Sequence, residues 1–169
     1  SRILGGMTEI LRRERPDILL VHGDTSSAFS SALAAFYLGI PVGHVEAGLR
    51  TYDISSPFPE EFNRRAVSLI SSVDFAPTEA ARDRLIAEGK SPERVFVTGN
   101  TVIDALKYTA IDEVCDGKTV LLTAHRRENL GEPMHNMFRA IRRVMEEHPD
   151  VKAIYPIHMN PVVRQAADE

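Results

Sequence analysis

The sequence has one cysteine, Cys115, and no tryptophan. A lone cysteine cannot form an intramolecular disulfide and provides no cysteine pair for a zinc site. The N-terminus starts without methionine and lacks the basic and apolar regions of a secretory signal, so it resembles the interior of a longer chain. These absences predict a reducing compartment, and we expect the cytoplasm.

Long apolar runs and an excess of basic charge are also missing. The longest apolar stretch, residues 32–42, is interrupted by Gly39 and Pro41 and is much shorter than the roughly 20 residues of a membrane-spanning helix. The chain carries 20 Lys+Arg against 24 Asp+Glu, a formal charge of −4, and its arginine pairs are scattered among carboxylates. We therefore predict that neither a membrane nor nucleic acid is a partner.

Short apolar runs alternate with helical periodicity along the whole chain, which predicts the α/β class with parallel sheets. Strands are expected over residues 17–22, 42–46, 74–77, 94–98, 119–123 and 151–157, with helices between them. The helix opening at Pro59 is predicted to bury one apolar stripe: Phe62, Ala66, Leu69, Ile70 and Val73. A polar stretch predicts two domains, residues 1–111 and 119–169, joined by a linker at 112–118.

Polar residues stand where several predicted strands end. Asp24, Glu46, His125 and His158 each follow a strand, and ligands of open parallel sheets bind beyond the carboxyl ends of strands. A carboxylate at such a position has a second interpretation, since it can cap the next helix. Several such residues at successive strand ends favour a binding site.

Two further segments carry charge at helix or strand ends. Pro59 is predicted at the first position of its helix, followed by Glu60, which either pairs with Arg64 one turn later or faces the same cleft as Asp24. His125 precedes two arginines, which either bind phosphate or form a solvated loop.

The sequence offers residues for a metal site but no nucleotide-binding loop. His22, Asp24, His44 and Glu46 alternate on two strands and could offer metal ligands, yet the same pattern arises from hydrogen bonding alone. We predict no metal. The chain has neither a Walker A motif nor a Gly-x-Gly-x-x-Gly motif, and Cys115 has no histidine nearby to activate it. We expect no cofactor.

Five strings together resemble one enzyme family. They are His22-Gly23-Asp24-Thr25, residues 43–51 (GHVEAGLRT), residues 57–61 (PFPEE) with Asn63-Arg64, residues 97–101 (VTGNT) with Asp104, and residues 123–129 (TAHRREN). In this order they resemble the non-hydrolysing bacterial UDP-N-acetylglucosamine 2-epimerases. The resemblance implies two Rossmann-like domains facing across a cleft, the glycosyltransferase-B arrangement. Both are incomplete here, because family chains are about twice as long.

The resemblance also implies roles for individual residues. Asp24, Glu46 and Glu60 match the family's acid/base carboxylates, and His125 matches its cleft histidine. Glu60, Arg126 and His158 match residues that contact a second UDP-N-acetylglucosamine in regulated members of the family. The implied partners are a UDP-sugar substrate and a second copy of the chain in a homodimer.

The implied reaction is inversion at C2 of UDP-N-acetylglucosamine to UDP-N-acetylmannosamine. It runs through elimination of UDP to 2-acetamidoglucal and re-addition of UDP, in a pathway of surface-polysaccharide synthesis, and it needs neither a metal nor a redox cofactor. Three alternatives stay open: a hydrolysing epimerase that releases N-acetylmannosamine and UDP, a glycosyltransferase of the same fold, and a sugar-nucleotide-binding module without activity.

Overall fold

The computed structural model describes residues 2–109, 117–126 and 129–168 of the chain. It divides into two compact units, residues 1–110 and 111–169. Most of the predicted linker, residues 112–116 including Cys115, lies outside the described residues, as do Arg127 and Glu128. Strand β5 already begins at Lys118, the last residue of that linker.

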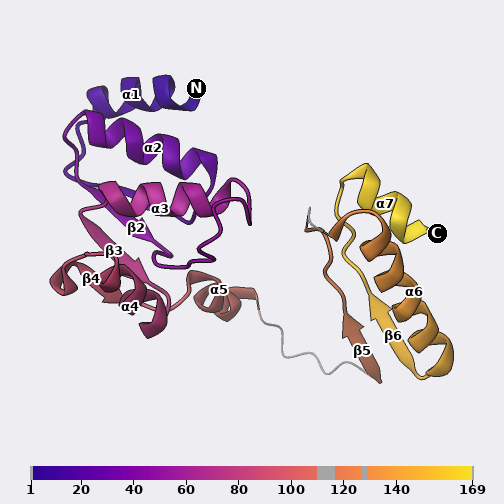
Figure 1. The fold of residues 1–169 in the computed structure, drawn as a ribbon. Helices are drawn as coiled ribbons and strands as arrows, with labels where there is room; N and C mark the ends of the chain where they lie inside the picture. The colour runs from indigo at the N-terminus through magenta and orange to yellow at the C-terminus, as the bar shows by residue number, and fades with distance from the viewer. Residues whose placement is uncertain (1, 110–116, 127–128, 169) are drawn as a thin grey trace. The chain divides into compact units, whose positions relative to one another are not determined.

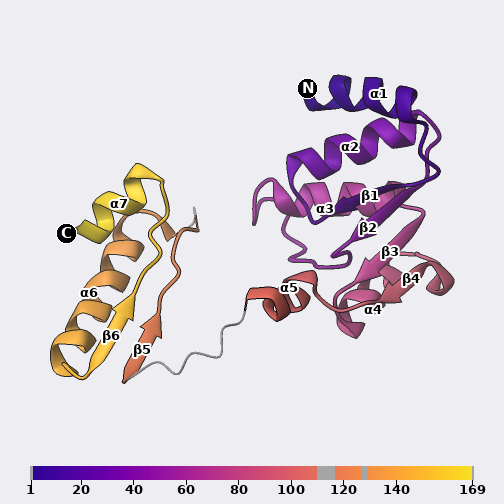
Figure 2. The same ribbon diagram turned by 180° about the vertical axis from the view of Figure 1, so that it is seen from behind.

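The first unit contains a parallel four-stranded sheet of order β1-β2-β3-β4. Its elements are α1 (Arg2–Glu14), β1 (Leu19–His22), α2 (Ser26–Tyr37), β2 (Val42–Val45), α3 (Glu60–Ile70), β3 (Val73–Ala76), α4 (Glu79–Ala87), a 3-10 turn (Pro92–Arg94), β4 (Val95–Val97) and α5 (Thr101–Thr109). Helix α1 packs outside α2, α2 packs on α3 and β1, and α4 packs on β3 and β4 (Figures 1 and 2).

The strands follow the sequence prediction to within a few residues, whereas α1 was not predicted. Its adjacent glycines, Gly5 and Gly6, each lower helix propensity by about 1 kcal/mol relative to alanine. Tertiary packing overrides that cost, because Leu11 is buried in a core with residues of β1, β2, α2 and α3.

The register of the strands shows which residues share each face of this sheet. Val21 of β1, His44 of β2, Asp74 of β3 and Val95 of β4 lie side by side and are all buried beneath the helices. Side chains alternate along a strand, so Leu20 and Phe96 belong to the other face, where they are 59% and 50% exposed. The covered face thus holds two ionisable side chains, His44 and Asp74, within its core.

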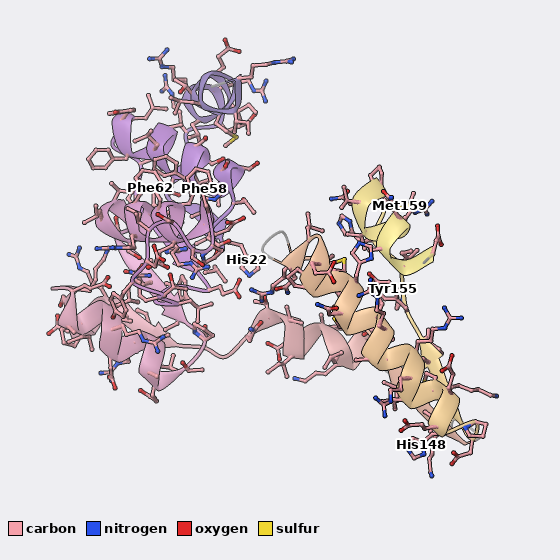
Figure 3. The ribbon with its side chains drawn as sticks, turned by 45° about the vertical axis from the view of Figure 1, so that its right-hand side comes forward. His22, Phe58, Phe62, His148, Tyr155 and Met159 are labelled. Atoms are coloured by element: carbon pink, nitrogen blue, oxygen red, sulfur yellow. The ribbon has the colours of Figure 1, made fainter. Side chains whose placement is uncertain are left out.

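The predicted buried stripe of α3 is wrong. Leu69 is 85% exposed, and Phe62, labelled in Figure 3, is 44% exposed. The Phe62 ring contacts that of Phe29 edge to face. The buried residues of this helix are instead Glu61, Asn63, Val67 and Ser68. The apolar periodicity predicted the wrong inward face for this helix. Polar side chains can be buried there because they form hydrogen bonds with neighbouring loops.

The second unit contains a parallel pair, β5 (Lys118–Leu121) and β6 (Val151–Ile154), with α6 (Glu132–Glu147) and α7 (Pro161–Asp168). Met134 of α6 and Val163 of α7 are buried together. Tyr155 donates its hydroxyl to the carbonyl of Ala124 at 2.6 Å and joins the segments after β6 and β5. In the described part of the chain, no helix is both long and apolar enough to span a membrane.

Candidate functional site

Asp24 lies in the turn between β1 and α2. Gly23 before it has a φ of +70°, which favours glycine, and Thr25 after it caps α2 by accepting from the Ala28 N–H at 3.1 Å. The capping interpretation of Asp24 is therefore wrong, because the neighbouring threonine performs that task. The Asp24 carboxylate is left to face other elements.

Its principal partner is Arg64 of α3. The Arg64 Nε lies 3.1 Å from Asp24 Oδ2, and Nη2 contacts the same oxygen. Both side chains are largely sheltered, with 27% of Asp24 and 13% of Arg64 exposed. The alternative of a Glu60–Arg64 pair is wrong, since the guanidinium contacts Asp24 and Glu61 instead.

Glu61 is a fully buried carboxylate that connects this pair to the loop after β2. It accepts from the backbone N–H groups of Thr51 and Tyr52, both at 3.1 Å, and from Arg64 Nη1 at 3.2 Å. The sequence pattern predicted no separate role for Glu61. The available signal was its spacing of three residues from Arg64, which places the two on neighbouring turns of one helix face.

Glu46 follows β2 in a left-handed conformation, with a φ of +66°. Such a backbone is uncommon for a residue with a Cβ atom and is enriched at functional sites. Its Oε2 lies 3.4 Å from His22 Nε2, which is also 3.3 Å from Thr101 Oγ1. Glu46 thus lies against the end of β1, next to the turn that carries Asp24.

Glu60 opens α3, one turn before Arg64. It is half-buried, and its side chain forms no hydrogen bond or ion pair with any described residue. Pro59 occupies the cap position rather than the predicted first helical position. The first unit therefore places Asp24 and Glu46 at adjacent strand ends, and Glu60 on the helix that holds Asp24.

His44 is part of a separate, buried network. Its Nε2 lies 2.9 Å from the Gly23 carbonyl, and its Nδ1 lies 3.8 Å from Asp74 Oδ1. Burial lowers the pKa of His44; the Gly23 hydrogen bond and Asp74 oppose this shift, and the charges of Arg50 and Lys90 add to it.

The strand register argues against a metal site formed by His22, Asp24, His44 and Glu46. His22 and His44 lie on opposite faces of the sheet, because His22 pairs in register with Val45 rather than His44. Within the described residues, no three histidine, cysteine or acidic side chains group as metal ligands would.

The second unit brings two of the predicted residues together. The rings of His125 and His158 stack, with centroids 5.2 Å apart and an interplanar angle of 24°. His158 Nδ1 also accepts from the Asn160 N–H at 3.1 Å. Arg126 follows His125 and is exposed. A stacked imidazole pair beside an arginine, at the carboxyl ends of two parallel strands, is suited to binding an anionic group.

Comparison with known proteins places this geometry in context. The sequence model of the UDP-N-acetylglucosamine 2-epimerase family matches residues 1–169. The UDP-N-acetylglucosamine 2-epimerase of Bacillus subtilis is 54% identical over 175 residues, covering 99% of this chain and 46% of its own length. The chain therefore spans about half the length of such relatives.

Solved structures of UDP-N-acetylglucosamine 2-epimerases are similar to this chain as well. S. aureus MnaA, in a structure with UDP, is 49% identical with a TM-score of 0.95, and the match covers 99% of this chain and 48% of that one. The Neisseria meningitidis UDP-GlcNAc 2-epimerase bound to UDP-GlcNAc is 41% identical with a TM-score of 0.88, covering 98% and 49%. The predicted fold class, two Rossmann-like units of the glycosyltransferase-B type, is confirmed. The chain belongs to the UDP-N-acetylglucosamine 2-epimerase family.

Proposed function

We propose that the protein carrying this chain is an isomerase that interconverts UDP-N-acetylglucosamine and UDP-N-acetylmannosamine without hydrolysis. The observation that carries the proposal is the convergence of Asp24 and Glu46 at adjacent strand ends, with Asp24 held by Arg64 of the helix that Glu60 opens. The relatives support the substrate class, since their structures hold UDP and UDP-GlcNAc.

The proposed reaction has two reversible halves. A base takes the proton from C2 while the bond between C1 and the β-phosphate oxygen breaks, which gives 2-acetamidoglucal and UDP. A proton is then delivered to the opposite face of C2, and the phosphate oxygen adds back to C1. All atoms are conserved, and the chemistry needs a base and an acid on the two faces of the sugar.

Asp24 and Glu60 are the proposed proton-transfer pair. Their surroundings differ, because Asp24 contacts a guanidinium whereas Glu60 has no hydrogen-bond or ion-pair partner among the described residues. Two carboxyl groups in different environments can divide the acid and base roles. Glu46 is a third acid/base or orienting group, which its strained backbone directs to the end of β1.

The second unit would bind the diphosphate. His125, whose ring stacks on that of His158, is proposed to stabilise the charge of the departing UDP. Arg126 and His158, with Glu60, are the proposed contacts of a second UDP-N-acetylglucosamine in a regulatory site. A homodimer and a cytoplasmic location remain predictions.

The test uses the full-length protein in deuterated water. We expect UDP-N-acetylmannosamine with deuterium at C2, and Asp24→Asn or Glu60→Gln should lower turnover by about 10²-fold, as expected for loss of a general acid or base. Asp83→Asn and Glu79→Gln are matched controls on α4, where both side chains are mainly exposed. Because Glu79 also lies in a first helical turn, it controls for the helix dipole.

The alternatives give different products. A hydrolysing epimerase releases free N-acetylmannosamine, a glycosyltransferase needs an acceptor, and a binding module turns nothing over. Product without deuterium at C2, or normal turnover in both catalytic variants, would contradict the proposed mechanism.

A further inference from the structure

The backbone of Asp24 is held on both sides by side chains from other elements. The preceding carbonyl, that of Gly23, lies 2.9 Å from His44 Nε2, and the carbonyl of Asp24 itself accepts from Asn63 Nδ2 at 2.8 Å. The Gly23 N–H donates to the Val45 carbonyl at 2.9 Å. Both peptide groups that flank Asp24 are therefore fixed.

The hydrogen bond to Gly23 determines which nitrogen of His44 carries the proton. A carbonyl oxygen only accepts, so Nε2 must be the donor, and the neutral ring then has its lone pair on Nδ1. Nδ1 faces Asp74, whose Oδ1 accepts from Ser71 Oγ at 2.8 Å and whose Oδ2 lies 3.2 Å from Lys90 Nζ. Ser71 thus satisfies Oδ1 of Asp74, whereas Oδ2 has only the ion-pair contact with Lys90.

Burying this polar network in the core beneath the sheet costs desolvation free energy. His44 and Asp74 are both fully buried, and His44 Nδ1 and Asp74 Oδ2 have no hydrogen-bond partner among the described residues. A pair of apolar side chains of similar volume would avoid that desolvation. A buried polar group with an unsatisfied atom calls for an explanation, and a role at a functional site is one such explanation.

We propose that His44 is a positioning residue for the epimerisation proposed above, on which this inference rests. Its Nε2–H holds the Gly23 carbonyl and thereby keeps the Asp24 carboxylate where the C2 proton is transferred. His44 does not touch the substrate, because it lies on the helix-covered face of the sheet and is fully buried. It acts through the turn that carries Asp24.

Two amide substitutions separate this role from simple filling of space. In His44→Gln the side-chain amide reaches about as far as Nε2 and can donate to Gly23. In His44→Asn the amide is one carbon shorter and cannot. Both variants are uncharged and polar, so they differ mainly in whether they restore this one hydrogen bond.

The experiment measures kcat and KM of the full-length protein for UDP-N-acetylglucosamine. We expect His44→Asn to lower kcat by about 10²-fold, the effect of a displacement of about 1 Å in a reacting group, with KM unchanged. His44→Gln should recover most of this loss. Leu11→Ala, a buried change in α1, is the control: it should lower the melting temperature and leave kcat intact.

A double-mutant cycle with Asp24→Asn completes the test. If His44 acts through Asp24, His44→Asn costs no further kcat in the Asp24→Asn background. An equal fold-loss in both backgrounds would overturn the inference, as would equal kcat values for the Gln and Asn variants. Absence of epimerisation by the parent protein would instead refute the proposed function, so the two failures are distinguishable.

Discussion

Glu60 and Glu61 are adjacent and identical in chemistry, yet the structure gives them opposite roles. Glu61 is fully buried and accepts three hydrogen bonds, whereas Glu60 has no such partner among the described residues. We predict that Glu61→Gln lowers stability, and that Glu60→Gln lowers turnover with little effect on stability.

The expected loss of stability in Glu61→Gln follows from the contacts of Glu61. A glutamine keeps one oxygen, which can still accept from Thr51 and Arg64, and turns its amide group toward the Tyr52 N–H. One hydrogen bond to a charged group is lost, worth about 1.5–3 kcal/mol, and the remaining two lose their charge assistance. We expect a total loss of about 2–4 kcal/mol, below the roughly 3–5 kcal/mol for removing a whole partner of a buried ion pair.

Hydrogen exchange of the full-length protein provides the assay. The Thr51 and Tyr52 amides are protected by Glu61 alone among the described contacts. In Glu61→Gln the Tyr52 amide loses its acceptor and should exchange about 10²-fold faster, the equivalent of about 2.7 kcal/mol, whereas the Thr51 amide keeps an acceptor and should accelerate less. A thermal melt should show a lower midpoint for this variant. Both readouts should be unchanged in Glu60→Gln.

Turnover below the melting transition is the complementary measurement. Glu60→Gln should lose about 10²-fold in kcat, and Glu61→Gln should lose less. Unchanged amide protection in Glu61→Gln, together with a kcat loss equal to that of Glu60→Gln, would refute this division between a structural and a catalytic carboxylate.

Three further predictions concern other residues. Arg64→Lys should lower kcat about tenfold or more, because a lysine cannot contact Asp24 and Glu61 together and a charged hydrogen bond of about 1.5–3 kcal/mol is lost; normal kcat would contradict this. Burial lowers the pKa of His44 below its ordinary 6.5, so the parent should lose stability relative to His44→Gln as pH falls below 6.5, where the unfolded chain takes up the proton first; urea midpoints at two pH values test the sign. His158→Ala should weaken activation by UDP-N-acetylglucosamine more than turnover, and unchanged sigmoidal kinetics would count against the regulatory site.

The sequence by itself determined the order and type of most elements. Alternating apolar runs predicted the strands, whose observed bounds lie within a few residues of the predicted ones. These signals are local, because caps, glycine stops and periodicity act within a few residues. Five motifs in order along the chain, among them those that contain Asp24 and Glu46, also indicated the family.

Only the tertiary structure decided which polar groups meet. The choice of Asp24 over Glu60 as the partner of Arg64 depends on how α3 packs against the end of β1, forty residues away in sequence. The burial of Glu61 and of the His44–Asp74 pair depends on strand register and on which helix face turns inward. Periodicity counts apolar residues, whereas a polar side chain becomes buried when distant backbone and side-chain groups satisfy it, and those partners exist only in the folded chain.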